Sequence, residues 1–138
     1  MMKDIKNGIE KGDYGFRRTV ELSFGDAVER IKSALKDEGF GVLTEIDMKA
    51  KFKEKLDKDF GEYVILGACN PGFAFQSLGI EMDLGLLLPC NAVVYERNGK
   101  IVIGLIDAEK MLGLTGRSEL ANMAKEVNSR LERALASV

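Results

Sequence analysis

Apolar and polar residues alternate in several short segments of the chain, which is the pattern of strands with one buried face. In the first of them, YGFRRTVELS, the apolar residues share a face with Arg18, which therefore needs a sheet edge or a partner. The last two segments are joined by Asn98-Gly99, the strongest short signal for a hairpin. The predicted strands are residues 14–23, 42–47, 63–68, 91–97 and 100–106.

Two longer segments have apolar residues at helical spacing. The first begins after Ser23, where Asp26 forms a short version of the capping box. It ends at Gly39, and Phe40 can pack back on the last turn. The second begins at Ser118 and keeps the helical period almost to the end of the sequence. The apolar stripe of this long C-terminal helix must lie on a sheet or on a partner helix.

Residues 48–60, MKAKFKEKLDKDF, form a third helical segment that Asp47 can cap. Its apolar residues recur every four positions, so the segment has one narrow apolar stripe. The stripe consists of Met48, Phe52, Leu56 and Phe60. Lysines give the segment a basic surface, but acidic residues offset them and no aromatic residues interleave on the exposed side. We interpret this surface as a solvated helix face rather than a site for nucleic acid.

Two short helical insertions complete the pattern. Asn70 can cap a helix by accepting a bond from a backbone N–H, and Pro71 suits the first helical position because it lacks an N–H. A short helix is therefore expected from Pro71 to Leu78 or Ile80, and Asp107 can cap a single further turn. A doubly wound parallel sheet would need longer crossover helices after each strand.

The order of the elements is β-α-β-β-β-β-α with short helical insertions. A hairpin followed by one long amphipathic helix favours an α+β fold, in which helices lie on one side of an antiparallel sheet. Residues 1–13 are charged and have little apolar content, so we interpret them as a peripheral N-terminal extension. Residues 14–138 are then expected to form a single α+β domain.

The composition excludes several classes of chemistry. The 138 residues include no histidine, which removes Ser-His-Asp and Cys-His catalysis and histidine metal ligands. Two cysteines cannot form a four-thiolate zinc site within one chain. Glycine-rich nucleotide-binding motifs do not occur. We therefore expect no cofactor and no metal, and the sequence leaves open whether the protein is an enzyme.

The charge balance indicates the surroundings of the protein. The net charge of −2 does not favour nucleic acid or an anionic membrane as a partner. No apolar run is long enough to span a bilayer, and the N-terminal residues lack the apolar stretch of a signal peptide. These features favour a cytoplasmic location, where the two cysteines are reduced more often than bridged.

Each cysteine precedes an asparagine, in the pairs Cys69-Asn70 and Cys90-Asn91. Cys69 ends one predicted strand and Cys90 opens the next, so antiparallel pairing would place both thiols at the same end of the sheet. Free cysteine is often a small buried hydrophobe, and we favour that role. The alternative is thiol chemistry, because a cysteine just before a helix start can have a lowered thiol pKa. Cys90 could then be its resolving partner, or both thiols could bind a soft metal.

A ligand pocket is the other candidate site. A sheet with a helix packed on it can leave a surface for a ligand, which a mixed apolar segment of the chain could line. The residues of this segment are Phe73, Phe75, Leu86 and Leu88. Glu45 and Glu96 are the acidic residues most suited to point from strands toward a shared cavity. The more common outcome is that these apolar residues belong to the core and that the glutamates face solvent.

Three segments together resemble the domain-of-unknown-function 302 family of small bacterial and archaeal proteins. They are GEYVILGACNPGFAFQSLG, GLLLPCNAVVYE and VLTEIDMKAKFKEKLDKDF. The resemblance covers residues 14–138 and implies a half-barrel sheet similar to the TATA-binding-protein fold, in a homodimer. It does not imply DNA binding or any other function. We therefore favour a homodimeric binding module for a small apolar ligand or a peptide, with the thiol-dependent function as the alternative.

Overall fold

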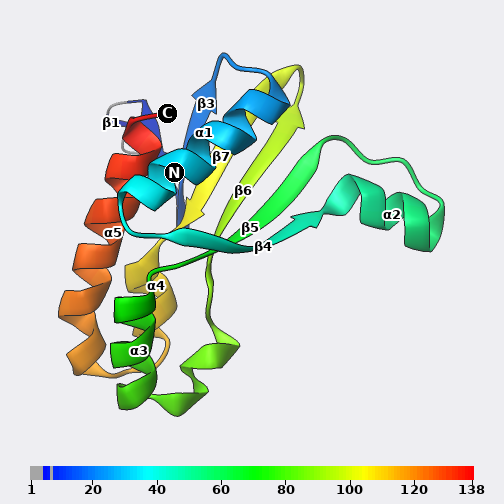
Figure 1. Ribbon diagram of the computed structural model, residues 1–138. Helices are drawn as coiled ribbons and strands as arrows, with labels where there is room; N and C mark the ends of the chain where they lie inside the picture. The colour runs from blue at the N-terminus through cyan, green and yellow to red at the C-terminus, as the bar shows by residue number, and fades with distance from the viewer. Residues whose placement is uncertain (1–4, 7) are drawn as a thin grey trace.

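The computed structural model describes residues 5, 6 and 8–138, which form an α+β fold (Figure 1). In chain order the elements are β1 Ile5–Lys6, β2 Ile9–Lys11, β3 Gly15–Val20, α1 Phe24–Asp37, β4 Gly41–Asp47, α2 Met48–Leu56, β5 Tyr63–Cys69, α3 Pro71–Ile80, the 3-10 segment η1 Met82–Leu86, β6 Cys90–Arg97, β7 Lys100–Ile106, α4 Ala108–Gly113, the 3-10 segment η2 Ser118–Leu120 and α5 Ala121–Ala136. From β3 onward, this sequence of elements confirms the predicted order with its short helical insertions.

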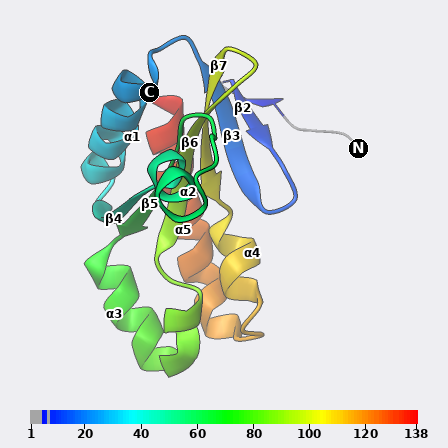
Figure 2. The ribbon, with the colours of Figure 1, turned by 90° about the vertical axis from the view of Figure 1, so that its right-hand side faces the viewer.

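The described strands form one open antiparallel sheet in the order β1-β2-β3-β7-β6-β5-β4. Two helices cover one face: α1 contacts β4, β6 and β7, and α5 contacts β2, β3 and β7. No helix layer among the described residues covers the opposite face, which we call the open face. Figure 2 looks onto it, with α2 in front of the sheet.

The core lies between the sheet and these two helices. Strand residues alternate between the two faces, and those on the covered face are apolar and buried in the central strands. The fully buried large side chains of the sheet and the helices α1 and α5 include Phe16, Leu66, Val94, Ile103, Ile31, Leu35, Leu131 and Leu135. The long C-terminal helix therefore packs on the sheet as its stripe predicts.

Local signals set the ends of the elements as expected. The side-chain oxygen of each predicted cap accepts a hydrogen bond from a backbone N–H of the first helical turn. These bonds are Asp26 N to Ser23 Oγ at 3.1 Å, Ala50 N to Asp47 Oδ1 at 3.0 Å, Phe73 N to Asn70 Oδ1 at 3.1 Å and Glu109 N to Asp107 Oδ1 at 2.9 Å. The β6–β7 hairpin turns at Asn98 and Gly99, whose φ angles of 54° and 75° are those of a tight hairpin turn.

Arg18 finds its partner at the far end of the chain. It lies on the covered face of β3, opposite Ile103. Its Nη1 donates to the carbonyl oxygens of Leu135, Ala136 and Val138 at 2.9, 2.8 and 2.8 Å. The last carbonyls of a helix lack partners within the helix and carry partial negative charge, so a guanidinium is a suitable donor to them. This contact fixes the C-terminus of α5 to the third strand.

A buried polar cluster joins β7, α4 and α5. Asp107 and Asn128 are both buried. Asn128 donates from Nδ2 to Asp107 Oδ1 at 2.8 Å, and its Oδ1 accepts the backbone N–H of Ala108 at 2.7 Å. Buried polar groups are costly unless they are paired, and these two side chains pair each other. The cluster therefore sets how the C-terminal helix meets the start of α4.

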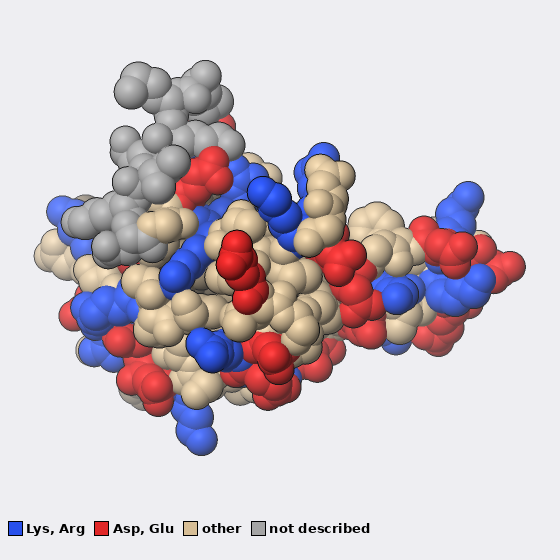
Figure 3. Space-filling view, turned by 90° about the horizontal axis from the view of Figure 1, so that it is seen from above, with Lys and Arg blue, Asp and Glu red and all other residues tan. Residues whose placement is uncertain are grey.

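Residues 48–62, which we call the arm, project away from the rest of the molecule (Figures 1 and 3). None of the nine residues of α2 is buried. The helix ends at Leu56, because Asp57 adopts a left-handed conformation with φ 51°. Phe60 therefore lies outside the helix, but its ring packs edge-on against Phe52 with centroids 4.9 Å apart. Lys49 pairs with Glu62 at 2.8 Å. Beyond these contacts within the arm, the ring of Phe60 lies 6.2 Å from that of Tyr63 at the start of β5.

The N-terminal segment differs from the expectation. Residues 1–4 and 7 lie outside the described part, but Ile9–Lys11 pairs with β3, and Ile9 belongs to the core. These residues are thus part of the sheet rather than a peripheral extension. At the other edge, the pairing of β4 with β5 shifts between Val42 and Thr44, which is a β-bulge.

Candidate functional site

The two Cys-Asn pairs lie on neighbouring strands at the same end of the sheet, as chain direction suggested. Cys90 pairs with Ala68, and Asn91 pairs with Gly67. Because side chains alternate along a strand, Cys90 shares the covered face with Ala68, and Cys69 belongs to the other face. Cys90 is buried and Cys69 is half-buried, and neither forms a disulfide. Adjacent strands therefore bring the cysteines close, with their side chains on different faces.

The environment of Cys90 disfavours its thiolate. Burial, together with a smaller effect of negative charge on Cys69, raises the pKa of this thiol to about 11. A nucleophilic or metal-binding cysteine needs the opposite, a lowered thiol pKa. Among the described residues, no group of three or more His, Cys, Asp or Glu side chains is placed to hold a metal ion.

The apolar residues proposed for the pocket do not line one cavity. Phe73 and Leu88 are partly buried and pack against the core. The ring of Phe73 also lies 5.2 Å from the guanidinium of Arg130. Phe75 and Leu86 are 84% and 86% exposed. The four residues are thus divided between the core and the exposed surface, and none of them lines the hollow described below. Asn70 acts as the cap of that helix.

Glu45 and Glu96 also do not share a cavity. Glu45 pairs with Leu66 on the covered face and forms an ion pair with Lys32 of α1. Glu96 pairs with Ile101 near the hairpin and is exposed to solvent. Both glutamates therefore lie on the covered side of the sheet or at its end, and neither lines a cavity with the Cys-Asn pairs.

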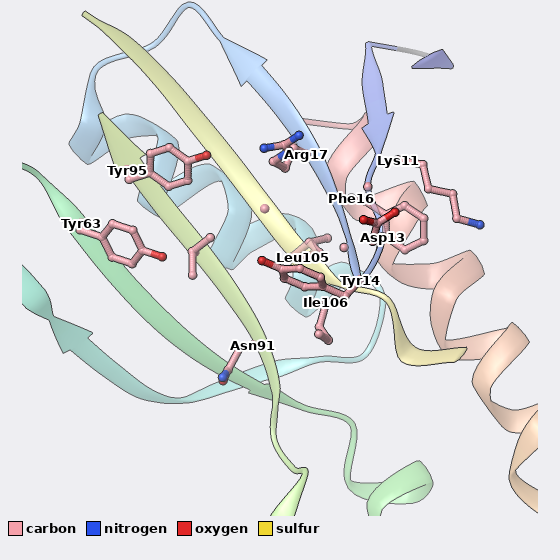
Figure 4. Close-up of a pocket in the computed structure, with 14 residues that line it drawn as sticks. Lys11, Asp13, Tyr14, Phe16, Arg17, Tyr63, Asn91, Tyr95, Leu105 and Ile106 are labelled. Atoms are coloured by element: carbon pink, nitrogen blue, oxygen red, sulfur yellow. The ribbon is translucent and has the colours of Figure 1, made fainter. Parts of the chain in front are cut away.

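A hollow of about 680 Å³ lies on the open face. The residues that line it come from the end of β2, the β2–β3 turn, and β3, β5, β6 and β7 (Figure 4). Its lining consists of Lys11, Gly12, Asp13, Tyr14, Gly15, Phe16, Arg17, Tyr63, Asn91, Val93, Tyr95, Gly104, Leu105 and Ile106. Asn91 is the one residue of the sequence-based candidate set in this lining.

Gly104 forms the floor of the hollow. It pairs with Arg17 of β3 on one side and with Val93 of β6 on the other. A Cβ at this position would lie 3.1 Å from Val93 Cγ2 and 3.7 Å from Arg17 Cγ. The missing side chain therefore leaves space between Arg17 and Val93 that another residue would fill. This local feature deepens the middle of an otherwise continuous sheet surface.

Tyrosine rings form the walls. The rings of Tyr63 and Tyr95 stack across β5 and β6, with centroids 5.4 Å apart and an interplanar angle of 9°. Figure 4 shows these two tyrosines and Tyr14 on different sides of the hollow, with their hydroxyl groups directed toward it. Burial raises the pKa of the Tyr63 phenol, and negative charge on Tyr95 or Tyr14 raises it further. The Tyr63 hydroxyl is therefore protonated near neutral pH and can donate a hydrogen bond.

The charged groups of the hollow are Arg17, Lys11 and Asp13. Arg17 lies at the end opposite Asn91 (Figure 4), and its Nη2 is 4.0 Å from Glu10 Oε2. Lys11 Nζ lies over the ring of Phe16, 5.7 Å from its centroid. The site thus combines aromatic walls with hydroxyl, amide and guanidinium groups, which suits binding and orientation of a small molecule.

The sequence alone does not single out the tyrosines, Arg17 or Gly104 as site residues. Alternation did place Arg17 on the face opposite Phe16, and the same rule places Asn91, Val93 and Tyr95 together on β6. This alternation is the signal in the sequence that could have indicated which of these side chains share the open face. The hollow itself depends on which residues lie side by side across strands, and one sequence does not give this register.

The fold and the site define a small α+β protein: an open antiparallel sheet with helices on one face and a hollow on the other. The family model of the domain of unknown function DUF302 matches residues 16–138, so the chain belongs to this family. The chain is similar to an uncharacterized conserved DUF302 protein from Bacillus stearothermophilus, known from a crystal structure. The two are 33% identical with a TM-score of 0.83, over 90% of this chain and 97% of that one. No curated protein matches the sequence.

These comparisons confirm the family resemblance and the α+β fold. Within the described residues, no helix is long and apolar enough to cross a membrane.

Proposed function

We propose that this protein is a homodimeric binding module whose open-face hollow accepts a small, largely apolar ligand. The observation that carries the proposal is the hollow of about 680 Å³ on a sheet face without a helix layer. Pockets for small molecules have volumes of roughly 300–1,000 Å³. Peptides more often bind along a sheet edge or in a long groove, so a compact hollow favours a small molecule.

The lining supports an apolar ligand body. The stacked rings of Tyr63 and Tyr95 stand on one side, and Val93 and Ile106 contribute aliphatic surface. Aromatic walls bury large apolar area, and their hydroxyl groups orient what they bind. The few polar groups in the hollow then give specificity, as in other small-molecule sites.

The arm supports the homodimer. A helix of nine residues is only marginally stable alone in water, yet α2 buries none of its residues within the chain. Leu56 is 59% exposed, and Phe60 and Ile46 are also exposed. The arm and the open face lie on the same side of the sheet (Figure 2). In a two-fold dimer the same surfaces meet reciprocally, so a second copy would cover both arms at once.

The thiol-dependent alternative has less support. It needs a thiolate at Cys69 or Cys90, but burial raises the pKa of Cys90 to about 11. The two side chains also belong to different faces of the sheet. We therefore do not propose a redox or soft-metal function for these cysteines.

The ligand-binding proposal can be tested with the neutral fluorophore N-phenyl-1-naphthylamine. We expect saturable fluorescence enhancement by the wild-type protein. Val93→Trp should weaken binding at least about tenfold, because the introduced indole ring occupies the hollow. Thr19→Trp, an exposed position of β3 outside the lining, is the matched control. Circular dichroism would verify that both variants fold.

Two results would contradict this proposal. Wild-type protein that does not bind the fluorophore would leave the hollow without a binding role. Equal binding by Val93→Trp and Thr19→Trp would place the fluorophore elsewhere on the molecule. Tyr95→Ser, which removes one wall without adding bulk, gives a second test of the same site if Val93→Trp is unstable.

The dimer can be tested by size-exclusion chromatography with multi-angle light scattering. We expect the wild-type protein at twice the chain mass of 15.2 kDa. Leu56→Glu should give the monomer, because it places a charge in the proposed interface. Leu114→Glu, at another exposed leucine, should stay dimeric. A monomeric wild-type protein, or a dimeric Leu56→Glu variant, would contradict this part of the proposal.

A further inference from the structure

We propose that the ligand of the hollow is a small flat apolar molecule with one anionic group, such as a carboxylate, phosphate or sulfonate, which Arg17 binds. This inference rests on the proposed function and specifies its ligand class. Three features of the hollow support it: the excess of hydrogen-bond donors, the geometry of the aromatic walls and the position of the guanidinium.

The lining offers more donors than acceptors. Tyr14, Tyr63 and Tyr95 direct hydroxyl groups toward the hollow (Figure 4), and a protonated phenol can donate. Arg17 has a guanidinium with five N–H donors and no acceptor. Asp13 is the one carboxylate in the described lining, against Arg17 and Lys11. A ligand with acceptor oxygens can pair with these donors, and a negative charge on it would add to the partial balance that Glu10 gives Arg17 at 4.0 Å.

Arg17 has donors available for a ligand. Its separation from Glu10 is 4.0 Å, longer than a hydrogen bond, and its side chain is 42% exposed. Guanidinium groups bind carboxylate, phosphate and sulfonate oxygens through paired N–H donors. The side chain of Arg17 also borders the space above Gly104. An anion at Arg17 would therefore be joined to a ligand body that fills the middle of the hollow.

The walls favour a flat body. Tyr63 and Tyr95 stack on each other at an interplanar angle of 9°, and both line the hollow. Tyr14 lies on another side of the same space (Figure 4). Aromatic rings prefer offset-stacked or edge-to-face contact with other rings, so a planar apolar molecule suits these walls. Val93 and Gly104 beneath it provide an apolar floor.

Two fluorophores with the same aromatic skeleton separate the anion from the apolar body. 8-Anilino-1-naphthalenesulfonate is N-phenyl-1-naphthylamine with an added sulfonate. We expect the sulfonate probe to bind about tenfold more tightly, because a hydrogen bond to a charged group contributes about 1.5 kcal/mol or more. The exposure of Arg17 places the effect at the low end of that range.

The variant Arg17→Gln identifies the residue responsible. We expect it to lower the affinity for the sulfonate probe to that for the neutral probe, and to leave the neutral probe unaffected. Arg97→Gln, at an exposed arginine of β6 outside the lining, is the matched control and should change neither affinity. If Arg17→Gln does not fold, the double variant Tyr63→Phe with Tyr95→Phe removes two hydroxyl donors and keeps both rings. We expect it to weaken binding of the sulfonate probe more than binding of the neutral probe.

Equal affinities for the two probes in the wild-type protein would overturn this inference while leaving the proposed function intact. So would equal effects of Arg17→Gln and Arg97→Gln, which would indicate general attraction to the surface. Failure of the neutral probe to bind at all would remove the proposed function itself, and the ligand class with it.

Discussion

Cys90 should make the protein lose stability as the solution becomes alkaline. Its thiol lies at the start of β6 against Ala68, and burial raises its pKa from 9.0 to about 11. Below about pH 9, both the folded and the unfolded chain carry the neutral thiol, so the stabilising effect is complete. As the pH rises through the folded-state value, the unfolded chain ionises first, and the free energy of unfolding falls.

The expected magnitude follows from the shift. One pKa unit corresponds to about 1.36 kcal/mol, so the shift from 9.0 to about 11 corresponds to roughly 3 kcal/mol in total. Between about pH 8 and about pH 10, the contribution of this thiol should fall by about 1.3 kcal/mol. Lysines and tyrosines titrate over the same range, so the effect must be isolated by comparison with a variant that lacks the thiol.

Urea unfolding followed by circular dichroism provides the assay, with wild-type protein, Cys90→Ala and Cys69→Ala under reducing conditions. The stability difference between wild type and Cys90→Ala should shrink by about 1.3 kcal/mol over this pH range. Cys69→Ala, which removes the half-buried thiol, should keep most of the pH dependence, because burial is the larger cause of the raised pKa of Cys90. A difference between wild type and Cys90→Ala that does not change with pH would refute the reasoning and reopen the question of an accessible thiolate.

Three further substitutions test contacts that stabilise the fold, each by urea unfolding. Arg18→Met should cost about 2 kcal/mol, because it removes three bonds to carbonyls at the C-terminal end of α5 and just beyond it, whereas Arg97→Met should have little effect. Asn128→Leu should cost about 2–3 kcal/mol, since a buried backbone N–H and a buried carboxylate each lose a partner; no loss would refute the role of this cluster. Gly39→Ala should cost about 1–2 kcal/mol, because φ is 89° and an added Cβ would lie 2.8 Å from a side-chain nitrogen. Gly25→Ala, where nothing lies within 4 Å of the new Cβ, should be neutral or stabilise by up to about 1 kcal/mol.

Short-range signals in the sequence predicted most of the fold. Ser23, Asp47 and Asn70 are caps because a side-chain oxygen close to the first turn can accept a free backbone N–H. Asn98-Gly99 makes a hairpin because both residues tolerate positive φ. These choices depend on a few neighbouring residues and need no knowledge of the rest of the chain.

The residues of the candidate site could not be predicted from such local signals. They become neighbours only through the register of strands that are distant in the sequence. Alternation along residues 14–23 places Arg17 on the face opposite Phe16, but its neighbour Gly104 comes from a strand far along the chain. The sequence around Glu45 gives no indication of an ion pair, because the packing of α1 on the sheet is what brings Lys32 to this glutamate. Ile9 is not recognisable as a core residue from the sequence, because charged residues surround it. The pairing of β2 with β3 nevertheless buries its side chain.

The pairing of β3 with β7 has a consequence for the synthesis of the protein. Residues 15–20 are made early, and their partners, residues 101–106, emerge from the ribosome only after β4, β5 and β6. Contacts between such distant segments form slowly, because a long loop must close first. Phe16 therefore stays without its cover until β7 and α5 have been translated. During that interval the nascent chain exposes apolar residues of its unfinished sheet, and this is when it most needs protection from aggregation.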